Sequence, residues 1–198
     1  MITHLNGILA KKSPTEAIID VHGVGYSVFI SLSTYEKLPE INQKISMLTY
    51  FHIREDIQQL YGFVTEFERE VFRLLISVSG IGPKMAQTIL SGIRPEELSQ
   101  TIAQGAVGAL TSIPGVGKKT AERLVVELKD KFGKVVFETE TLHDSSPSSI
   151  RSEALNALVS LGLSREKAEL AIRNVLNSSE KVISVELLIK KALQFSNK

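Results

Sequence analysis

Two short glycine- and lysine-containing segments carry the residues with the clearest chemistry in this sequence. Ser79–Ala86 (SGIGPKMA) and Pro114–Ala121 (PGVGKKTA) share the order glycine, aliphatic, glycine, any residue, lysine, any residue, alanine, at an offset of 35 residues. Each segment follows an apolar stretch of helical spacing and opens another. A motif that recurs in this way indicates one structural unit used twice.

The residue types in the repeat fit an anion-binding helical hairpin. Glycine is needed where φ is positive or where the backbone must approach a ligand closely, and the aliphatic residue between the glycines can anchor the hairpin in a core. The helix that follows offers free N–H groups and the positive end of its dipole, and a lysine in its first turn adds a charge-assisted contact. Two such units can hold the phosphates of both strands across a minor groove without reading sequence. The repeat therefore predicts tandem helix-hairpin-helix motifs that bind DNA.

The candidate DNA contacts in the repeat are its glycines and the cations that follow them: Gly80, Gly82, Lys84, Gly115, Gly117, Lys118, Lys119 and Arg123. Two alternatives stay open, because the glycines can serve only as turns and Arg123 can be an ordinary solvated charge. The formal net charge of +1 gives no general support for nucleic-acid binding. The hypothesis therefore depends on local geometry.

Other functional motifs do not fit. Gly115–Thr120 resembles a phosphate-binding P-loop, but that pattern needs glycine at 112 and Ser or Thr at 119, where Ser112 and Lys119 stand. The pair Gly23 and Gly25 lacks the third glycine of a dinucleotide-binding fingerprint. The four histidines have no metal-ligand spacing, and no Gly-x-Ser-x-Gly segment occurs. We therefore expect no catalytic residue, no metal site and no cofactor.

Three segments of different pattern must position these residues. Residues 1–63 hold short β-branched and aromatic runs separated by turns, which predict a small barrel or sandwich; the strands are expected at 17–21, 26–32, 45–53 and 57–63. Residues 64–137 change to helical spacing, with a capping box at Thr65–Glu68. Pro95 suits the first turn of a further helix, and we expect others at 106–111 and 118–131.

The last third of the chain combines a polar segment with a compact helical one. Residues 138–149 (ETETLHDSSPSS) are acidic and serine-rich, which predicts a flexible linker. Three helices follow, expected at 150–161, 164–176 and 184–195. Three short helices in so few residues predict a small bundle with a thin core.

The composition is that of a soluble globular protein. Of the 198 residues, 43% are hydrophobic and 23% charged. Cysteine is absent, which excludes disulfides and thiolate metal sites and fits a reducing compartment. The N-terminus has no secretory signal pattern, and no apolar stretch is long enough to span a membrane. We therefore expect a cytoplasmic protein without a membrane partner.

Over its whole length the chain resembles the RuvA family of Holliday-junction-binding proteins. Besides the two hairpins, the matching residues are Arg54-Glu55-Asp56 ahead of Leu60–Phe63 (LYGF) and the C-terminal segment Ala154–Leu163. The resemblance implies a multi-domain α+β fold. Its parts are an OB-like β-barrel for assembly (1–63), an all-α tandem helix-hairpin-helix domain (64–137), a flexible linker (138–149) and a three-helix, UBA-like bundle (150–198).

The resemblance also implies a function. The chain would form a homotetramer, one or two per junction, that binds a four-way (Holliday) junction, holds it open and recruits a hexameric RuvB-type ATPase. That ATPase would supply the motor for branch migration in recombination, DNA repair and the SOS response to DNA damage, so this chain would not be an enzyme. A RuvC-type resolvase is a further implied partner.

Three groups of residues take roles from this resemblance. Arg54 would contact DNA, and Glu55 and Asp56 would form an acidic pin whose carboxylates repel phosphates at the crossover. The alternative for this pair is an ordinary acidic turn. The bundle would bind the motor through Leu158, Leu161 and Leu163, although core packing is the default role for these leucines.

Two other functions remain open alternatives. Helix-hairpin-helix motifs also occur in DNA repair glycosylases and nucleases, but a base pocket needs aromatic walls, and this chain has no tryptophan and 6% aromatic residues. A nuclease needs clustered acidic metal ligands, but Glu96 and Glu97 match a helix start, and Glu138 and Glu140 lie in the expected linker. The second alternative is a general scaffold, binding DNA without structural preference or binding only protein.

Overall fold

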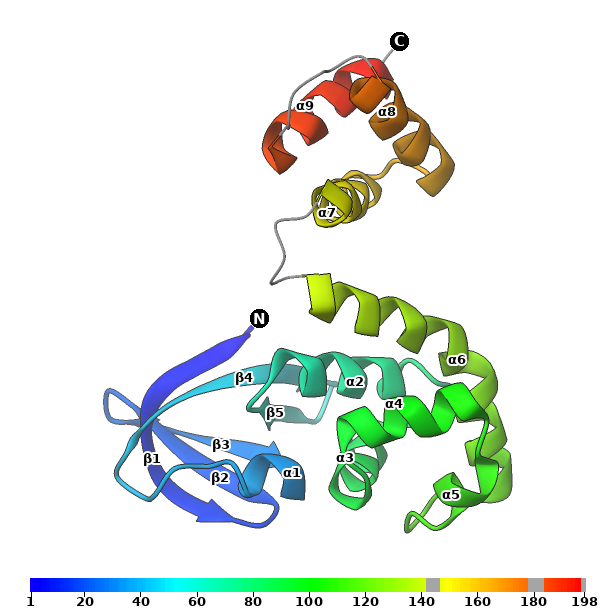
Figure 1. Cartoon of the computed structure of the whole chain (residues 1–198). Helices are drawn as coiled ribbons and strands as arrows, with labels where there is room; N and C mark the ends of the chain where they lie inside the picture. Colours follow the sequence, from blue (N-terminus) through cyan, green and yellow to red (C-terminus); the bar gives the residue numbers. More distant parts are fainter. Residues whose placement is uncertain (142–146, 178–183, 197–198) are drawn as a thin grey trace. The chain divides into compact units, whose positions relative to one another are not determined.

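The chain, described here by a computed structural model, divides into two compact units, Met1–Val136 and Phe137–Lys198, which we call the N-terminal and C-terminal units. Figure 1 shows strands and helices in the first unit and helices in the second. The structure describes residues 1–141, 147–177 and 184–196, and describes side chains for 1–132, 150–176 and 184–195.

Five strands form a closed barrel in the order β1-β2-β3-β5-β4, in which β3 and β5 pair parallel and the other neighbours antiparallel. The expected OB-like barrel is thereby confirmed. A one-turn helix, α1 (Leu32–Tyr35), leads from β3 toward β4. The strands are β1 (His4–Ser13), β2 (Glu16–Val21), β3 (Val24–Ile30), β4 (Lys44–Ile53) and β5 (Gln58–Phe63).

Strand β1 was not among the strands expected from the sequence. Its residues include asparagine, glycine and two lysines, which are poor strand formers. Two leucines nevertheless reach the barrel core, since Leu5 and Leu9 are buried, and the register shifts between Leu9 and Lys11. Its pairing with both β2 and β4 closes the barrel, so tertiary closure outweighs its weak local propensity.

The glycine of the LYGF segment is required by packing. A Cβ on Gly62 would lie 2.3 Å from the sulfur of Met47 and 2.6 Å from a methyl of Val28, both barrel-core residues. Since such distances are impossible without displacing the core, only glycine fits. This residue therefore serves the fold rather than a ligand.

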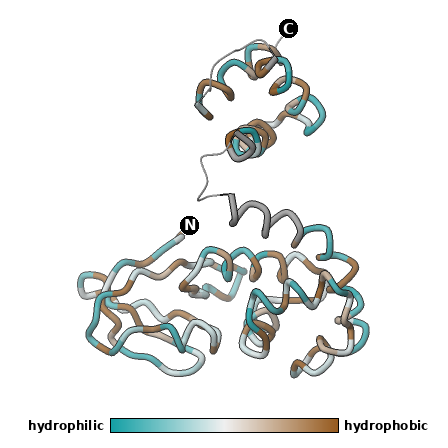
Figure 2. The backbone as a smooth tube through the Cα atoms, viewed as in Figure 1, coloured by the Kyte–Doolittle hydropathy of each residue, from teal (hydrophilic) through white to brown (hydrophobic). Residues whose placement is uncertain are grey.

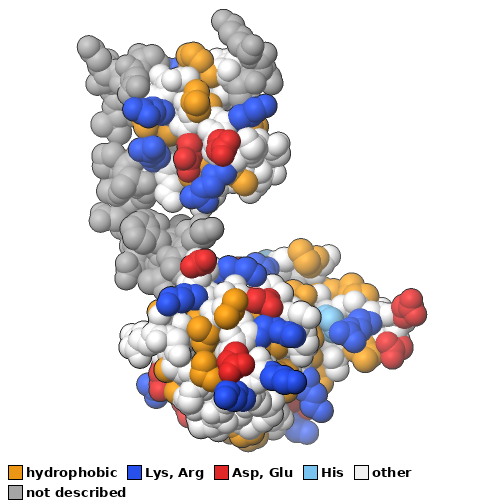
Figure 3. Space-filling view, turned by 90° about the vertical axis from the view of Figure 1, so that its right-hand side faces the viewer, with side chains coloured by type: hydrophobic (Ala, Val, Ile, Leu, Met, Phe, Trp, Pro, Cys, Tyr) orange, Lys and Arg blue, Asp and Glu red, His pale blue; other side chains and the backbone are white. Residues whose placement is uncertain are grey.

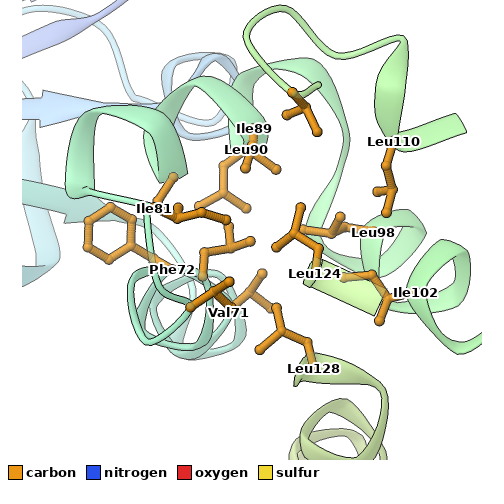
Figure 4. Packing of buried hydrophobic residues seen from close by; sticks show 14 of the residues in the cluster. Val71, Phe72, Ile81, Ile89, Leu90, Leu98, Ile102, Leu110, Leu124 and Leu128 are labelled. Carbon is orange, nitrogen blue, oxygen red and sulfur yellow. The ribbon is translucent and has the colours of Figure 1, made fainter. Parts of the chain in front are cut away.

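The helices of the N-terminal unit enclose one core. Figure 4 shows Val71, Phe72, Ile81, Leu98 and Leu124 converging from different elements. At the start of α2, the Thr65 hydroxyl accepts a hydrogen bond from the Glu68 amide, which confirms Thr65 as the cap. The Glu68 carboxylate instead accepts from two hydroxyls of the barrel segment, so the second half of the expected capping box is corrected. The helices are α2 (Glu66–Ile76), α3 (Pro83–Gly92), α4 (Pro95–Gln104), α5 (Val107–Thr111) and α6 (Lys118–Thr141).

The expected linker is shorter than predicted. Helix α6 continues past the expected end at Lys131 to Thr141, and α7 begins at Pro147, so 138–141 and 147–149 are helical. Glycine inside a helix costs only about 1 kcal/mol, so Gly133 does not end α6. Proline suits the first turn of a helix, which explains the early start of α7. Residues 142–146, with His143, lie outside the described residues.

The C-terminal unit is the expected three-helix bundle, formed by α7 (Pro147–Ser160), α8 (Arg165–Asn177) and α9 (Val185–Ser196). Its core is small and contains several alanines, which let the helices approach closely: Ala154, Leu158, Ala168, Ala171, Ile172, Val175, Leu188 and Ala192. In Figure 2, hydrophobic and hydrophilic stretches alternate along these helices, as one-sided burial requires.

A buried carboxylate joins the barrel to the helices within the N-terminal unit. Glu68 on α2 accepts hydrogen bonds from the hydroxyls of Ser31, at 2.5 Å, and Thr34, at 2.8 Å. All three residues are buried. Phe72 packs beside this contact against the rings of Tyr61 and Phe63, with centroids 5.2 and 5.0 Å apart. This joint sets how the barrel is oriented relative to the two hairpins.

Candidate nucleic-acid interface

The two hairpins have the same geometry. Gly80 has φ +88° and Gly115 has φ +84°, a region that favours glycine. One residue later, the amide of Ile81 donates to the carbonyl of Val78, and the amide of Val116 donates to that of Ile113, each at 3.0 Å. Both aliphatic residues are buried, which confirms their expected role as core anchors. The sequence repeat is therefore also a structural repeat.

The structural correspondence between the two hairpins begins before the first glycine of each. The helices that precede the hairpins end on Ser77 and Ser112, whose hydroxyls donate to the carbonyls of Leu74 and Ala109, each at 2.7 Å. Both serines keep helical backbone angles. The sequence comparison missed this pair, although the same offset of 35 residues relates them.

The second glycine of each hairpin is not required by the fold. Gly82 precedes α3 in an extended conformation, with φ −91° and ψ 173°, that any residue adopts. A Cβ on Gly82 or Gly117 would meet no atom of the chain within 4 Å. A side chain there would instead occupy open space in front of the helix N-terminus. The absence of a side chain leaves this space free for a ligand to reach the backbone N–H groups.

The hairpin lysines are free to bind an anion. Lys84 lies in the first turn of α3, and Lys118 and Lys119 open α6; all three are exposed. Within the described part of the chain, their ammonium groups make no ion pair or hydrogen bond. Several other cations are paired, such as Arg69 with Glu66 at 2.6 Å. The hairpins thus combine helix N-termini with uncompensated positive charge.

Arg123 links the two hairpins. From α6, its guanidinium donates to the carbonyl of Ser79 at 2.7 Å, and it lies 3.9 Å from the Glu127 carboxylate. A second contact runs from the first hairpin to the second. The methyl of Met85 on α3 lies 3.2 Å from the position that a Cβ on Gly115 would take. Arg123 is therefore neither a simple solvated charge nor a cation reserved for DNA. The sequence carried no signal of its contact with Ser79.

The expected pin residues form the tip of a β-hairpin. The Arg54 amide donates to the Ile57 carbonyl at 2.8 Å, which closes a tight turn between β4 and β5. Glu55 and Asp56 are the two central residues of this turn, and both are exposed. Gln59, near the start of β5, lines the same hollow as Lys84 of the first hairpin. The strand that leaves the acidic tip therefore borders the same hollow as the basic hairpin.

Comparison with known proteins covers nearly the whole chain. Three family models match: "RuvA N terminal domain" over residues 1–62, "SAM-like Helix-hairpin-helix tandem" over 72–130 and "RuvA, C-terminal domain" over 149–197. Proteins named Holliday junction branch migration complex subunit RuvA are 48% identical in Geobacter sulfurreducens, over 98% of both chains, and 44% identical in Chlorobium phaeobacteroides, over 98% of this chain and 97% of that one. The chain belongs to the RuvA family.

The hollow beside the first hairpin holds Gln87, which the sequence did not single out, and Tyr61 of the LYGF segment, for which the sequence predicted no contact. The side-chain amide of Gln87 on α3 is buried there without a hydrogen-bond partner among the described residues. Tyr61 donates its hydroxyl proton to Gln59 at 3.1 Å. Burial raises the pKa of Tyr61, an effect partly offset by the positive charge of Arg54. The phenol is therefore a neutral donor in this part of the site.

In the bundle, which matches the RuvA C-terminal domain, the three expected partner contacts differ in exposure. Leu158 is fully buried in the core, so its expected role as a direct partner contact is corrected. Leu163 packs against the same core. Leu161 is 62% exposed at the end of α7 and is the one of the three with a free side chain. The α7 periodicity alone did not separate these positions.

This RuvA-family chain has no group of three or more metal-ligating His, Cys, Asp or Glu side chains within its described ranges. None of the helices in those ranges is both long and apolar enough to cross a membrane.

Proposed function

We propose that this chain is a DNA-binding subunit, without catalytic activity of its own, that binds four-way DNA junctions and presents them to a separate motor. The observation that carries this proposal is the duplicated hairpin. Two helix N-termini have open approaches at Gly82 and Gly117, and exposed, unpaired lysines lie beside them. The relatives' printed name, Holliday junction branch migration complex subunit, supports the choice of substrate.

Each hairpin pair binds the backbone of one DNA arm. The amides of α3 and α6 donate to phosphate oxygens, while Lys84, Lys118, Lys119 and Arg54 add charge-assisted contacts. Since these contacts recognise phosphates, binding is independent of base sequence and weakens with salt. The face in Figure 3 mixes cationic, acidic and hydrophobic side chains, which agrees with local rather than bulk attraction.

Assembly compensates for the low net charge. Four copies arranged around a fourfold axis place one hairpin pair on each arm, and linked binding sites raise the overall affinity without new contacts. We assign assembly to the barrel, residues 1–63, and DNA binding to residues 64–137. One or two such tetramers bind each junction.

At the centre of the assembly, Glu55 and Asp56 act as the acidic pin. Their carboxylates repel the phosphates of the crossing strands, which keeps the junction open and mobile rather than tightly bound. The exposed position of both residues on a hairpin tip supports this role.

The C-terminal bundle, residues 150–198, recruits a hexameric RuvB-type ATPase that drives branch migration. Of the three expected leucines, Leu161 is the leading contact, because its side chain is exposed whereas Leu158 lies in the core of the bundle and Leu163 packs against that core. A RuvC-type resolvase is a further partner of the assembled complex, which acts in the cytoplasm during recombination and repair.

A gel-shift titration tests the proposal. The protein is titrated against a four-way junction and a duplex of matched length at two salt concentrations, beside a Lys84→Glu/Lys119→Glu variant. We expect salt-sensitive binding that favours the junction and is lost in the variant. Lys11→Glu/Lys167→Glu, which makes the same charge change at exposed sites outside the hairpins, should bind normally.

Three results would contradict the proposal. Equal affinity for junction and duplex would indicate a general DNA-binding scaffold, and no binding to either would reduce the hairpins to structural turns. Cleavage of branched or damaged DNA by the pure protein with Mg²⁺ would indicate a repair enzyme.

A further inference from the structure

Two exposed isoleucines flank the acidic tip of the β4–β5 hairpin. Ile53 ends β4 and is 60% exposed, and Ile57 follows the turn and is 37% exposed. We call this pair the tip isoleucines. Between them stand Arg54, Glu55 and Asp56, all exposed and charged. Hairpin tips are normally built from polar turn residues, so two isoleucines next to such a tip need an explanation.

The tip isoleucines lie on opposite faces of the hairpin. Ile53 pairs with Gln58 across the ladder, whereas Ile57 is joined to Arg54 by the hydrogen bond that closes the turn. Cross-strand partners share a face, and successive residues of a strand alternate between faces. Ile53 is therefore on one side of the tip and Ile57 on the other, so that the tip has an apolar flank on each side.

The fold does not use these side chains. Neither tip isoleucine belongs to a hydrophobic core of the described residues. The barrel core stops one layer earlier, at Leu60 and its cross-strand partner Phe51. Substitution of the tip isoleucines should consequently leave the barrel intact.

The charges on the tip restrict what can contact these flanks. Glu55 and Asp56 repel phosphates, so a DNA strand that approaches the tip must direct its backbone away and its bases inward. Base faces are apolar and match an aliphatic side chain. Gln59, two residues after Ile57 and on the same face of the extended chain, lines the same hollow as Lys84 of the first DNA-binding hairpin.

We propose that Ile53 and Ile57 form an apolar wedge, one residue on each side of the pin, against which unstacked bases at the junction crossover pack. Apolar side chains that insert at base steps partly unstack them in other DNA-binding proteins. The inference rests on the proposed junction binding. It adds a second function to the pin: the carboxylates exclude phosphates, and the isoleucines stabilise the bases exposed when pairs at the crossover open.

The test uses a non-migrating four-way junction with 2-aminopurine next to the crossover. This base analogue is dim when stacked and bright when unstacked, and contact with an aliphatic side chain does not quench it. Fluorescence is measured at protein concentrations that saturate the junction for each protein: wild type, Ile53→Ser/Ile57→Ser, and the control Ile41→Ser, at an exposed isoleucine elsewhere in the barrel segment. A second junction carries the probe in the middle of an arm, and light scattering reports the oligomeric state.

We expect wild type and Ile41→Ser to brighten the crossover probe and leave the arm probe dim. The double serine variant should keep less than about half of this rise, with unchanged oligomeric state. An equal rise in the double variant overturns the wedge, and so does a wild-type complex whose crossover probe stays dim. Loss of assembly in the double variant would overturn it too, because the isoleucines would then be contacts between copies. If wild type binds no junction at all, the proposed function fails instead.

Discussion

The guanidinium of Arg123 donates a hydrogen bond of 2.7 Å to the carbonyl of Ser79, which lies 44 residues earlier in the chain. The contact joins the helix that follows the second hairpin to the loop of the first. It therefore holds the two hairpins at a fixed spacing, which in the proposed function must match the spacing of phosphates across a groove. A side chain that the sequence predicted as a DNA contact is part of the frame that holds both hairpins.

Arg123→Ala should affect both stability and binding. We expect the free energy of unfolding in urea to fall by about 1 kcal/mol, the usual net value of one hydrogen bond, and junction affinity to fall as the hairpin spacing loosens. Lys129→Ala, at an exposed position on the same helix, is the matched control. If affinity falls while stability is unchanged, Arg123 contacts DNA and does not brace the hairpins.

The two glycines of the first hairpin should respond differently to alanine. Gly80→Ala places a Cβ at φ +88° and should destabilise the protein by about 1–2 kcal/mol. Gly82→Ala fits the backbone and meets no atom of the chain, so stability should stay equal or rise by up to about 1 kcal/mol. Junction affinity should nevertheless fall in Gly82→Ala, because its methyl group blocks the phosphate. Thermal unfolding and gel shifts on both variants check this, and normal affinity in Gly82→Ala would argue against backbone contact with DNA.

Neutralising the pin should change selectivity more than affinity. In Glu55→Gln/Asp56→Asn the repulsion of phosphates is lost, so junction binding should stay equal or become tighter while duplex binding rises. The ratio of junction to duplex dissociation constants measures the effect. Glu36→Gln/Glu153→Gln, at exposed sites away from the tip, should leave the ratio unchanged. An unaltered ratio and branch-migration rate in the pin variant would mean that the pair is an ordinary acidic turn.

Glu68 should be among the most sensitive polar residues of the N-terminal unit. Glu68→Ala leaves the buried hydroxyls of Ser31 and Thr34 without their acceptor and should lower the free energy of unfolding by about 2–4 kcal/mol. Glu68→Gln keeps an acceptor oxygen and should cost less. Glu66→Ala, which removes a surface ion pair with Arg69, should cost about 1 kcal/mol or less. Equal losses for Glu66→Ala and Glu68→Ala in urea unfolding would contradict the buried joint.

The raised pKa of Tyr61 predicts that the protein loses stability at alkaline pH. Burial raises its pKa above the ordinary value of 10.0, so the folded protein keeps the phenolic proton at pH values where the unfolded chain releases it. The resulting stabilisation is complete below the unfolded pKa and is lost as pH rises toward the folded pKa. Tyr61→Phe should therefore lose less stability than wild type above pH 10. If the free energies of unfolding of Tyr61→Phe and wild type fall by the same amount over this pH range, the phenol does not contribute to the loss of stability.

The sequence by itself determined the features that depend on neighbouring residues. The glycine at positive φ, the buried aliphatic residue and the lysine of the following helix lie within five residues of one another in each hairpin, and their conformation follows from local sterics and helix-end chemistry. The same holds for the cap at Thr65 and the tight turn that carries Glu55 and Asp56. These elements could be predicted because each is encoded by a short stretch of chain.

Only the tertiary structure decided the features that depend on chain segments meeting. Strand β1 exists because the barrel closes on it, despite its weak strand propensity. The partners of Glu68 and Arg123 lie 37 and 44 residues away in sequence, and no local pattern specifies such a distance. Leu158 is buried and Leu161 is exposed, which only the packing of the bundle decided. Cross-strand register placed Ile53 and Ile57 on opposite sides of the β4–β5 turn. The physical reason is common to all: burial and long-range hydrogen bonding are set by closure of the whole fold.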